Sequence, residues 1–237
     1  MATGFVPLPP GKPVCMHLTN FTEDWPDLLD KFGPDDLEGL EIITKDSPTI
    51  IKKLSHWHKL TALCFFNSLV KALNGHEDEY DESALKTEHL KLIDKLDQLR
   101  SIGLCGWGVD GAAVARMHLI NTINVLKLKR ITNLEALINV LPQKNNITEL
   151  WIGGMQLSDQ ELKQLTQMKN LRVLRIRRTG LSDSSWRWFK QMPALKRLTI
   201  DSNWNAEVRQ RFKDAVPFVE WELTTDFTYW KMFPDQK

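Results

Sequence analysis

The residues of this chain that could do chemistry are few, and the first group is a glycine-rich turn. Gly106-Trp-Gly108-Val-Asp-Gly111 matches the pattern G-x-G-x-x-G and precedes the helix-like stretch 112–119. After a strand, such a pattern can place the phosphates of a dinucleotide at a helix N-terminus. The next apolar stretch, however, ends in Lys127-Leu-Lys129-Arg130 and offers no acidic side chain for a ribose hydroxyl. We therefore predict a tight turn here and no nucleotide site.

A histidine pair and two cysteines also lack the partners that metal binding or catalysis requires. His56-Trp-His58 resembles half of a metal site, but no second pair of ligands at matching spacing accompanies it. Cys64 and Cys105 would act as nucleophiles only beside a base or in electropositive surroundings. We therefore predict no catalytic residue, no metal site and no cofactor. The residues expected beside the two cysteines are apolar or small: Ala62, Phe66, Ser101 and Gly103.

A different signal comes from positive charges that recur around a tryptophan. Lys127, Trp151 and Arg175 follow one another in equal steps along the chain. Such residues bind anionic or aromatic groups rather than make or break bonds. Whether they gather in space depends on the elements that carry them. Five further cations accompany them: Lys129, Arg130, Arg177, Arg178 and Arg197.

Four of these cations lie within or beside copies of a short apolar block that occurs three times. The blocks 147–152, 171–176 and 195–200 share the pattern LxxLxL, with isoleucine at some positions, and are equally spaced. Repetition at a fixed period is typical of a solenoid, in which each unit buries its apolar face against its neighbours. Side chains alternate between the two faces of a strand, so the apolar residues point inward and the residues between them point outward.

A turn and a helix follow each block. Ser158-Asp-Gln-Glu161 is a capping-box sequence, and Leu162, Leu165 and Met168 follow it at helical spacing. Strand, turn and helix within a step of about 24 residues resemble a leucine-rich repeat, and the step is too short for a dinucleotide-binding βαβ unit. The resemblance implies an α/β solenoid, a curved right-handed superhelix with parallel strands on its concave face and short helices on its convex face. It implies protein binding and no chemistry.

The same register extends in both directions and predicts about nine units. We assign residues 13–225 to the leucine-rich-repeat domain, 1–12 to an N-terminal extension and 226–237 to a C-terminal capping tail. One step, from Leu60 to Leu99, is longer than the others, which predicts an acidic insertion at about 74–88. Insertions in solenoids map to loops, so we expect a solvated loop, with a second contact surface as the alternative.

Composition narrows the function classes. The chain has 237 residues, 42% of them hydrophobic and 26% charged, and a net charge of +1, which gives no global attraction to nucleic acid or membranes. It contains no apolar stretch of membrane-spanning length. Its three cysteines are an odd number at irregular spacing, which favours reduced thiols and a cytoplasmic location. We expect a monomer.

The register places Lys127, Trp151 and Arg175 in a row, because equivalent positions on adjacent parallel strands lie about 4.8 Å apart. Several like charges on neighbouring strands repel one another, and tryptophan and arginine dominate interface hot spots. We therefore predict that the concave face binds a protein partner with an acidic surface. The predicted contact residues are Lys127, Lys129, Arg130, Trp151, Arg175, Arg177, Arg178 and Arg197.

Three alternatives stay open. Trp151 could serve only as a cation–π partner beneath the arginine stems. The chain could be the recognition domain of a larger enzyme, such as a kinase or a ubiquitin ligase, whose catalytic residues lie elsewhere. Single-stranded nucleic acid also suits cations interleaved with an aromatic side chain. The near-neutral net charge and the acidic residues Asp201, Glu220 and Glu222 disfavour nucleic acid.

Overall fold

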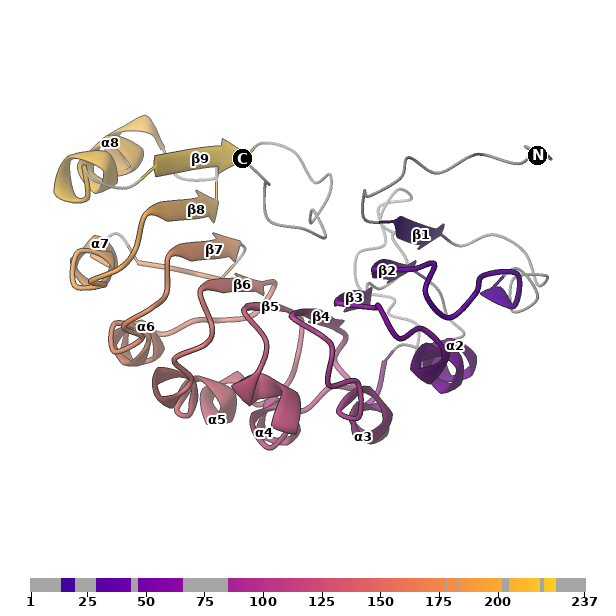
Figure 1. Ribbon diagram of the computed structural model, residues 1–237. Helices are drawn as coiled ribbons and strands as arrows, with labels where there is room; N and C mark the ends of the chain where they lie inside the picture. The colour runs from indigo at the N-terminus through magenta and orange to yellow at the C-terminus, as the bar shows by residue number, and fades with distance from the viewer. Residues whose placement is uncertain are drawn as a thin grey trace, which may run out of the picture.

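The fold is a single curved sheet with helices along its outer side. The computed structural model describes residues 14–19, 29–43, 47–65, 85–177, 179–182, 184–201, 205–217 and 220–224. Within these ranges, nine strands form one sheet in which each strand pairs in parallel with its neighbour along the chain. Figure 1 shows the strands on the inner side of the curve and the helices on its outer side.

The strands stand where the apolar blocks predict them. From β4 to β8, the strands begin at residues 101, 125, 149, 173 and 197, a constant step, so this part of the predicted register is confirmed. The residue pairs between strands follow the same step. The strands are β1 Cys15–Thr19, β2 Gly39–Ile43, β3 Ala62–Phe65, β4 Ser101–Cys105, β5 Val125–Lys129, β6 Glu149–Gly153, β7 Val173–Arg177, β8 Arg197–Asp201 and β9 Glu220–Thr224.

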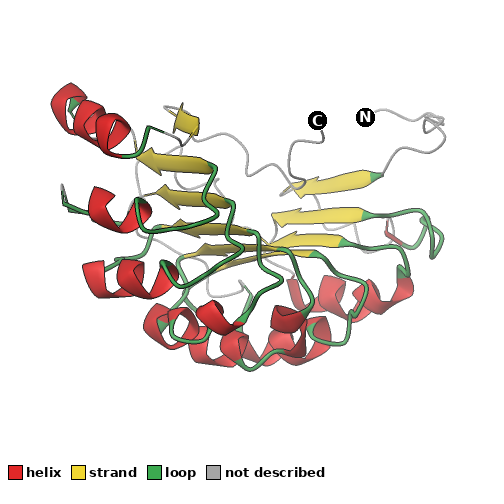
Figure 2. Cartoon of the chain, turned by 60° about the vertical axis from the view of Figure 1, so that its left-hand side comes forward, coloured by secondary structure: helices red, strands yellow, loops and turns green. Residues whose placement is uncertain are grey.

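Short helices connect the strands and lie along one side of the sheet, as Figure 2 also shows. Several begin at side chains that accept a backbone hydrogen bond, namely Asp110, Ser158 and Asn205. The α-helices are α2 Ser47–Lys53, α3 Leu90–Ile93, α4 Gly111–Ala115, α5 Leu134–Ile138, α6 Asp159–Leu165, α7 Trp186–Phe189 and α8 Ala206–Ala215, and the 3₁₀ helices are η1 Leu54–His56, η3 Thr87–His89, η4 His118–Asn121 and η5 Leu141–Gln143. No helix in the described ranges has the length and apolarity needed to cross a bilayer.

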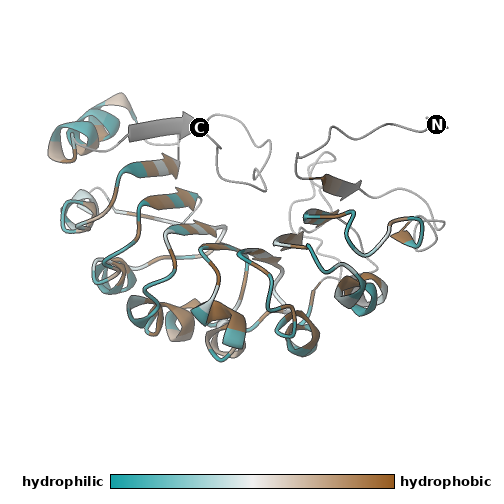
Figure 3. Cartoon of the chain, viewed as in Figure 1, coloured by the Kyte–Doolittle hydropathy of each residue, from teal (hydrophilic) through white to brown (hydrophobic). Residues whose placement is uncertain are grey.

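The core lies between the sheet and the helices. The strands and the helices each carry both hydrophobic and hydrophilic residues, as Figure 3 shows for the coloured part of the chain. On the strands β2 to β8, the apolar residues at alternate positions are buried in this core, as predicted. On the helices, the residues that pack against them include Leu162, Leu165, Phe189 and Phe212, all buried, and Trp186, which is partly buried. Burying a side chain of this size stabilises the fold by about 1.5–3 kcal/mol.

Asparagine side chains join adjacent units where the chain returns to the sheet. The amide of Asn146 donates to the carbonyls of Ile120 and Ile123, and the amide of Asn124 donates to the carbonyl of Asn146 at 3.1 Å. A similar bond runs from Asn170 to the carbonyl of the residue before Asn146 at 2.7 Å. These bonds satisfy backbone carbonyls that the short strands leave outside the sheet ladder.

The longer step between β3 and β4 does not interrupt the sheet. Ala62 pairs with Ser101, in the same register as the other strands. The segments assigned to the N-terminal extension (1–12), to most of the acidic insertion (74–84) and to the capping tail (226–237) lie outside the described residues.

Candidate binding face

The predicted row of Lys127, Trp151 and Arg175 is confirmed. Lys127 pairs with Trp151, and Trp151 pairs with Arg175, on the adjacent strands β5, β6 and β7. The Lys127 Nζ lies 4.2 Å from the centroid of the Trp151 ring, and the Arg175 Cζ lies 4.4 Å from it. Both distances fall within the range of cation–π contacts.

A carboxylate completes this row. The Trp151 Nε1 donates a hydrogen bond to the Glu149 Oε1, and the Arg175 Nε lies 4.0 Å from the same oxygen. We refer to Lys127, Glu149, Trp151 and Arg175 as the tryptophan layer. Glu149 is absent from the predicted site, although its position two residues before Trp151 places both side chains on the same face of β6.

The centre of the tryptophan layer is buried. Trp151 is 6% exposed and Lys127 is 2% exposed, although neither belongs to the core between sheet and helices. Burial lowers the pKa of Lys127, and the nearby carboxyl groups of Glu149 and Glu41 oppose that shift. The cation–π packing considered as an alternative is therefore present, and Trp151 supports its charged neighbours from beneath.

The partly exposed cations lie around the buried layer. Lys129 and Arg177 stand at the ends of β5 and β7, and Arg130 follows Lys129 in the turn. Arg197 stands at the beginning of β8, where it pairs with Val173, so it lies at the opposite end of the strands. The predicted patch therefore spans the length of the strands rather than forming one tight cluster. Arg178 lies outside the described residues.

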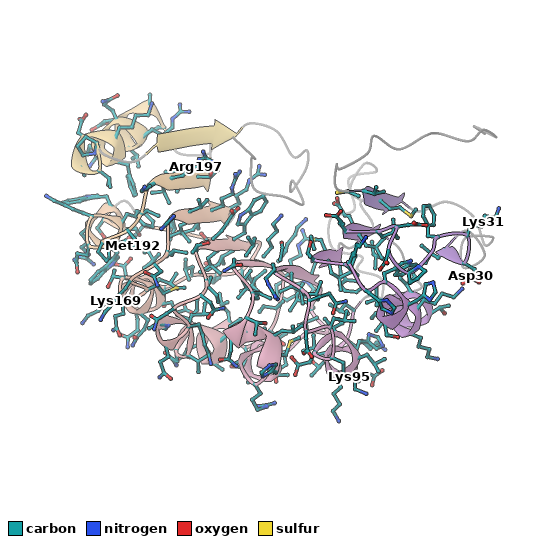
Figure 4. All side chains as sticks on the ribbon, viewed as in Figure 1. Asp30, Lys31, Lys95, Lys169, Met192 and Arg197 are labelled. Atoms are coloured by element: carbon teal, nitrogen blue, oxygen red, sulfur yellow. The ribbon has the colours of Figure 1, made fainter. Side chains whose placement is uncertain are left out.

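Cations on the inner and outer sides of the curved sheet differ in how far their side chains are buried. Figure 4 labels Arg197 at β8 and labels Lys95 and Lys169 on the helix-bearing outer side. Lys95 and Lys169 are exposed, whereas Arg197 is partly buried. These two lysines therefore provide natural controls for substitutions on the inner face.

The N-terminal half of the inner face carries cysteines and a carboxyl group. Cys64 and Cys105 are buried and form no disulfide, and burial raises the pKa of the Cys64 thiol, so its neutral form predominates. Gly103 pairs with Cys64, and a β-carbon on this glycine would overlap the Cys64 Sγ. Phe66, which the sequence predicts beside the two cysteines, lies outside the described residues.

Glu41 is a titratable group that sequence reasoning did not single out. Its side chain stands on β2 beside Cys64 and is 3% exposed. Burial raises its pKa to about 7, and the positive charge of Lys127 opposes that shift. A carboxyl group with this pKa changes its charge near neutral pH.

The glycine-rich turn has a structural role, and within the described ranges the histidine pair has no group of metal ligands around it. Gly106 has a φ of 137°, and Asp110 accepts a hydrogen bond from the Ala112 amide at the start of α4. A β-carbon on Gly111 would overlap the Asn133 carbonyl, so this glycine allows adjacent units to approach closely. The predicted tight turn is confirmed. In the described ranges, no three histidines, cysteines or carboxylates are grouped so that they could hold a metal ion.

No family model matches the chain, and no curated protein shows significant similarity to it.

The inner face of the sheet contains the tryptophan layer, whose centre is buried. Partly exposed lysine and arginine side chains on β5, β7 and β8 surround this centre. Guanidinium and ammonium groups held in this way suit the binding of anionic side chains.

Proposed function

We propose that this chain is a leucine-rich-repeat protein that binds an acidic protein segment on the inner face of its curved sheet, without catalysis. The constant repeat step, the parallel strands in chain order and the helices on the outer side support the family assignment. The known members of this architecture differ widely in function, so the binding proposal rests on the face itself.

The observation that carries the proposal is the gathering of cations on three nearby strands around the tryptophan layer. Lys129, Arg130, Arg175, Arg177 and Arg197 are partly exposed and lie within a span of four strands. Partly exposed cations that gather on one face give it a local positive potential, which attracts carboxylates. This charge suits the binding of an acidic protein segment.

The tryptophan layer prepares the face for binding. Arg175 stacks on the Trp151 ring while its Nε approaches Glu149, so its side chain is held in one conformation before a partner arrives. A long side chain that is already ordered loses less entropy on association. Trp151 therefore acts by holding Arg175 and Lys127 rather than by inserting into the partner.

The electrostatic character of the face determines how binding responds to salt. Partly exposed charges are screened over a Debye length of about 8 Å at physiological ionic strength. Complementary charges raise the association rate more than they raise the affinity. We expect the association rate to fall steeply as salt increases, with a smaller change in the dissociation rate.

The experiment measures binding of a fluorescein-labelled, glutamate-rich peptide by anisotropy, with wild type beside Arg175→Glu/Arg197→Glu. We expect the double variant to bind at least tenfold more weakly. The matched control is Lys95→Glu/Lys169→Glu, which makes the same change in net charge on the outer side and should bind as wild type does. Equal binding by the two double variants would contradict the proposed face. A single-stranded oligonucleotide that binds more tightly than the peptide would instead favour a nucleic-acid partner.

A further inference from the structure

A tryptophan side chain is exposed in the turn that follows β4. Trp107 is 46% exposed, and Leu92 on the outer helix α3 is the other large hydrophobic side chain in the described ranges that is exposed. Single exposed apolar side chains are common on proteins, so exposure alone does not indicate a function. The turn that carries Trp107 supplies the further evidence.

This turn is longer than its counterpart in the next unit. Two residue pairings enclose both turns, Cys105 with Lys129 and Asp110 with Thr132. Between these pairings lie four residues after β4 and two residues after β5. The core does not need the extra two residues, because each turn ends in a buried apolar residue. The two stretches are 106–109, which ends in Val109, and 130–131, which ends in Ile131.

Backbone hydrogen bonds close the turn and join it to the following unit. The Val109 amide donates to the Gly106 carbonyl at 3.1 Å, on either side of Trp107. The Gly106 amide donates to the Lys129 carbonyl at 3.0 Å. The Val109 carbonyl accepts from the Thr132 amide at 2.9 Å. The backbone is therefore held at both ends of the turn.

The preceding unit holds the middle of the turn. The Thr87 amide donates to the Gly108 carbonyl at 2.9 Å, and the Thr87 hydroxyl accepts from the Asp110 amide at 2.8 Å. The Trp107 side chain thus projects from a backbone that is already ordered. A large, stiff side chain on an ordered backbone loses little entropy on association, and tryptophan is among the residues that dominate binding energy.

Trp107 lies beside the proposed binding face. It follows β4, and the next strand, β5, carries Lys127 of the tryptophan layer. Adjacent strands lie about 4.8 Å apart, so the three steps from β4 to β7, which carries Arg175, cover about 14 Å. An extended peptide covers this distance with roughly four residues. An acidic segment on the cations of the face therefore brings a nearby part of its own chain to Trp107.

The chemistry of the indole indicates what this part of the segment carries. The face of an indole ring is electron-rich and does not attract a carboxylate. An apolar side chain, by contrast, buries its own surface and that of the ring when the two come into contact.

We propose that Trp107 is an anchor for an aromatic or large aliphatic side chain that lies about four residues from the carboxylates of the acidic partner segment. This inference rests on the proposed function and adds a contact that determines specificity, since it selects acidic segments with an apolar residue at this spacing.

The test compares two fluorescein-labelled peptides by anisotropy. One has a glutamate-rich centre with a phenylalanine about four residues to each side, which serves either orientation, and the other has serine at both places. We expect wild type to bind the phenylalanine peptide about tenfold more tightly. Trp107→Ala should bind both peptides with the wild-type affinity for the serine peptide. Trp107→Phe, which keeps an aromatic ring, should keep most of the preference.

A matched control and a stability measurement accompany the binding data. Leu92→Ala truncates the other exposed apolar side chain, on the outer side, and should keep the full preference for the phenylalanine peptide. Trp107→Ala should leave the melting temperature within about 2 °C of wild type, because an exposed side chain contributes little to stability. A fall of more than about 5 °C would show that the ring packs within the fold, which overturns the inference.

The remaining outcomes separate the anchor from the proposed function. If wild type binds neither peptide, the proposed function fails and the anchor fails with it. If wild type binds both peptides equally while Arg175→Glu/Arg197→Glu binds both more weakly, only the anchor is overturned. An equal loss of both peptides in Trp107→Ala also overturns it, because the ring would then not act on the apolar residue. So would tighter binding of a single-stranded oligonucleotide that depends on Trp107, which would indicate base stacking.

Discussion

The pairing of Gly103 with Cys64 leaves no room for a side chain on the glycine. A β-carbon there would overlap the Cys64 Sγ, and both residues lie on strands that cannot easily separate. We expect Gly103→Ala to lower the free energy of unfolding by about 2 kcal/mol, in the range of overpacked sites. Urea denaturation followed by circular dichroism measures the change.

The control for this prediction is a double-mutant cycle. Cys64→Ala removes the sulfur that the new methyl group meets, so Gly103→Ala should be less harmful in that background. If the two effects simply add, the steric explanation is wrong.

Glu41 should make stability depend on pH. Its folded pKa of about 7 lies above its ordinary value of 4.5, so the folded state binds the proton more tightly than the unfolded state. The stabilisation is complete below pH 4.5 and is lost as the pH rises to about 7, by up to roughly 3 kcal/mol. The difference in unfolding free energy between wild type and Glu41→Gln, measured at several pH values, isolates this contribution. A difference that does not change between pH 5 and pH 8 would contradict it.

Single positions on the binding face could be predicted from the sequence only in part. The register predicts the row of Lys127, Trp151 and Arg175, because alternation along a strand and the repeat step determine which residues are neighbours. It does not predict how deeply Trp151 and Lys127 are buried, because burial depends on side chains packed from several strands. Nor does it predict the role of Glu149, because the hydrogen bond from Trp151 to this carboxylate depends on side-chain conformations that the register leaves open.

The helix α6 begins with a reciprocal cap. The Ser158 Oγ accepts a hydrogen bond from the Glu161 amide at 3.2 Å, and the Glu161 carboxylate accepts one from the Ser158 amide at 2.7 Å. We expect Ser158→Ala to lower the free energy of unfolding by about 1 kcal/mol, the usual effect of losing an N-cap. Thermal and urea denaturation measure it. Gln160→Ala, an exposed change in the first turn of the same helix, should stay within about 0.5 kcal/mol, and an equal loss for both would argue against a capping effect.

Local sequence patterns predict where a helix starts better than they predict where it ends. The capping box predicts the start of α6 correctly, because both partners lie within one helical turn of each other. The stretch 112–119 is predicted as one helix, but it divides into α4 and η4, with Met117 extended between them. The Asp94 carboxylate, one unit earlier, accepts hydrogen bonds from the first two amides of η4 at 3.0 and 2.9 Å. A contact from so far along the chain overrides local helical preference.

The unit structure of the whole molecule predicts which deletions the fold tolerates. Deleting residues 147–170 removes one complete step and brings Leu171 to the place of Ile147, so that β7 can pair with β5 in register. We expect this variant to fold with a lower melting temperature, because each unit contacts mainly its neighbours. It should lose peptide binding, since Trp151 is gone and Lys127 would face Arg175 directly.

A deletion of half a step is the control. Removing residues 147–158 takes away β6 but leaves α6, so the register of the following strands is lost. We expect this variant to be unfolded or aggregated, which circular dichroism and gel filtration distinguish from a folded chain. Similar behaviour of the two deletions would show that the units are not independent modules.

At the scale of the molecule, the repeat step predicts the parallel strand order and the side on which the helices lie. It succeeds because one short pattern, repeated, specifies the same neighbour contacts each time. Residues 1–12, 74–84 and 226–237 carry no copy of this pattern, so the repeat step specifies no neighbours for them. The predicted boundaries of the units therefore follow from the repeats, and the roles of these three segments do not.

The pairing of every strand with the strand before it has a consequence for synthesis. Each new strand needs only a partner that has already left the ribosome, and from β4 to β8 that partner always lies the same short distance back along the chain. Pairing two strands closes the loop of chain between them, and the entropy cost of this closure grows with the length of the loop. Strands separated by a short loop can therefore pair early in folding. The nascent chain can therefore add one unit at a time from its N-terminal end, and the longer separation of Ala62 from Ser101 is the closure at which we expect this growth to pause.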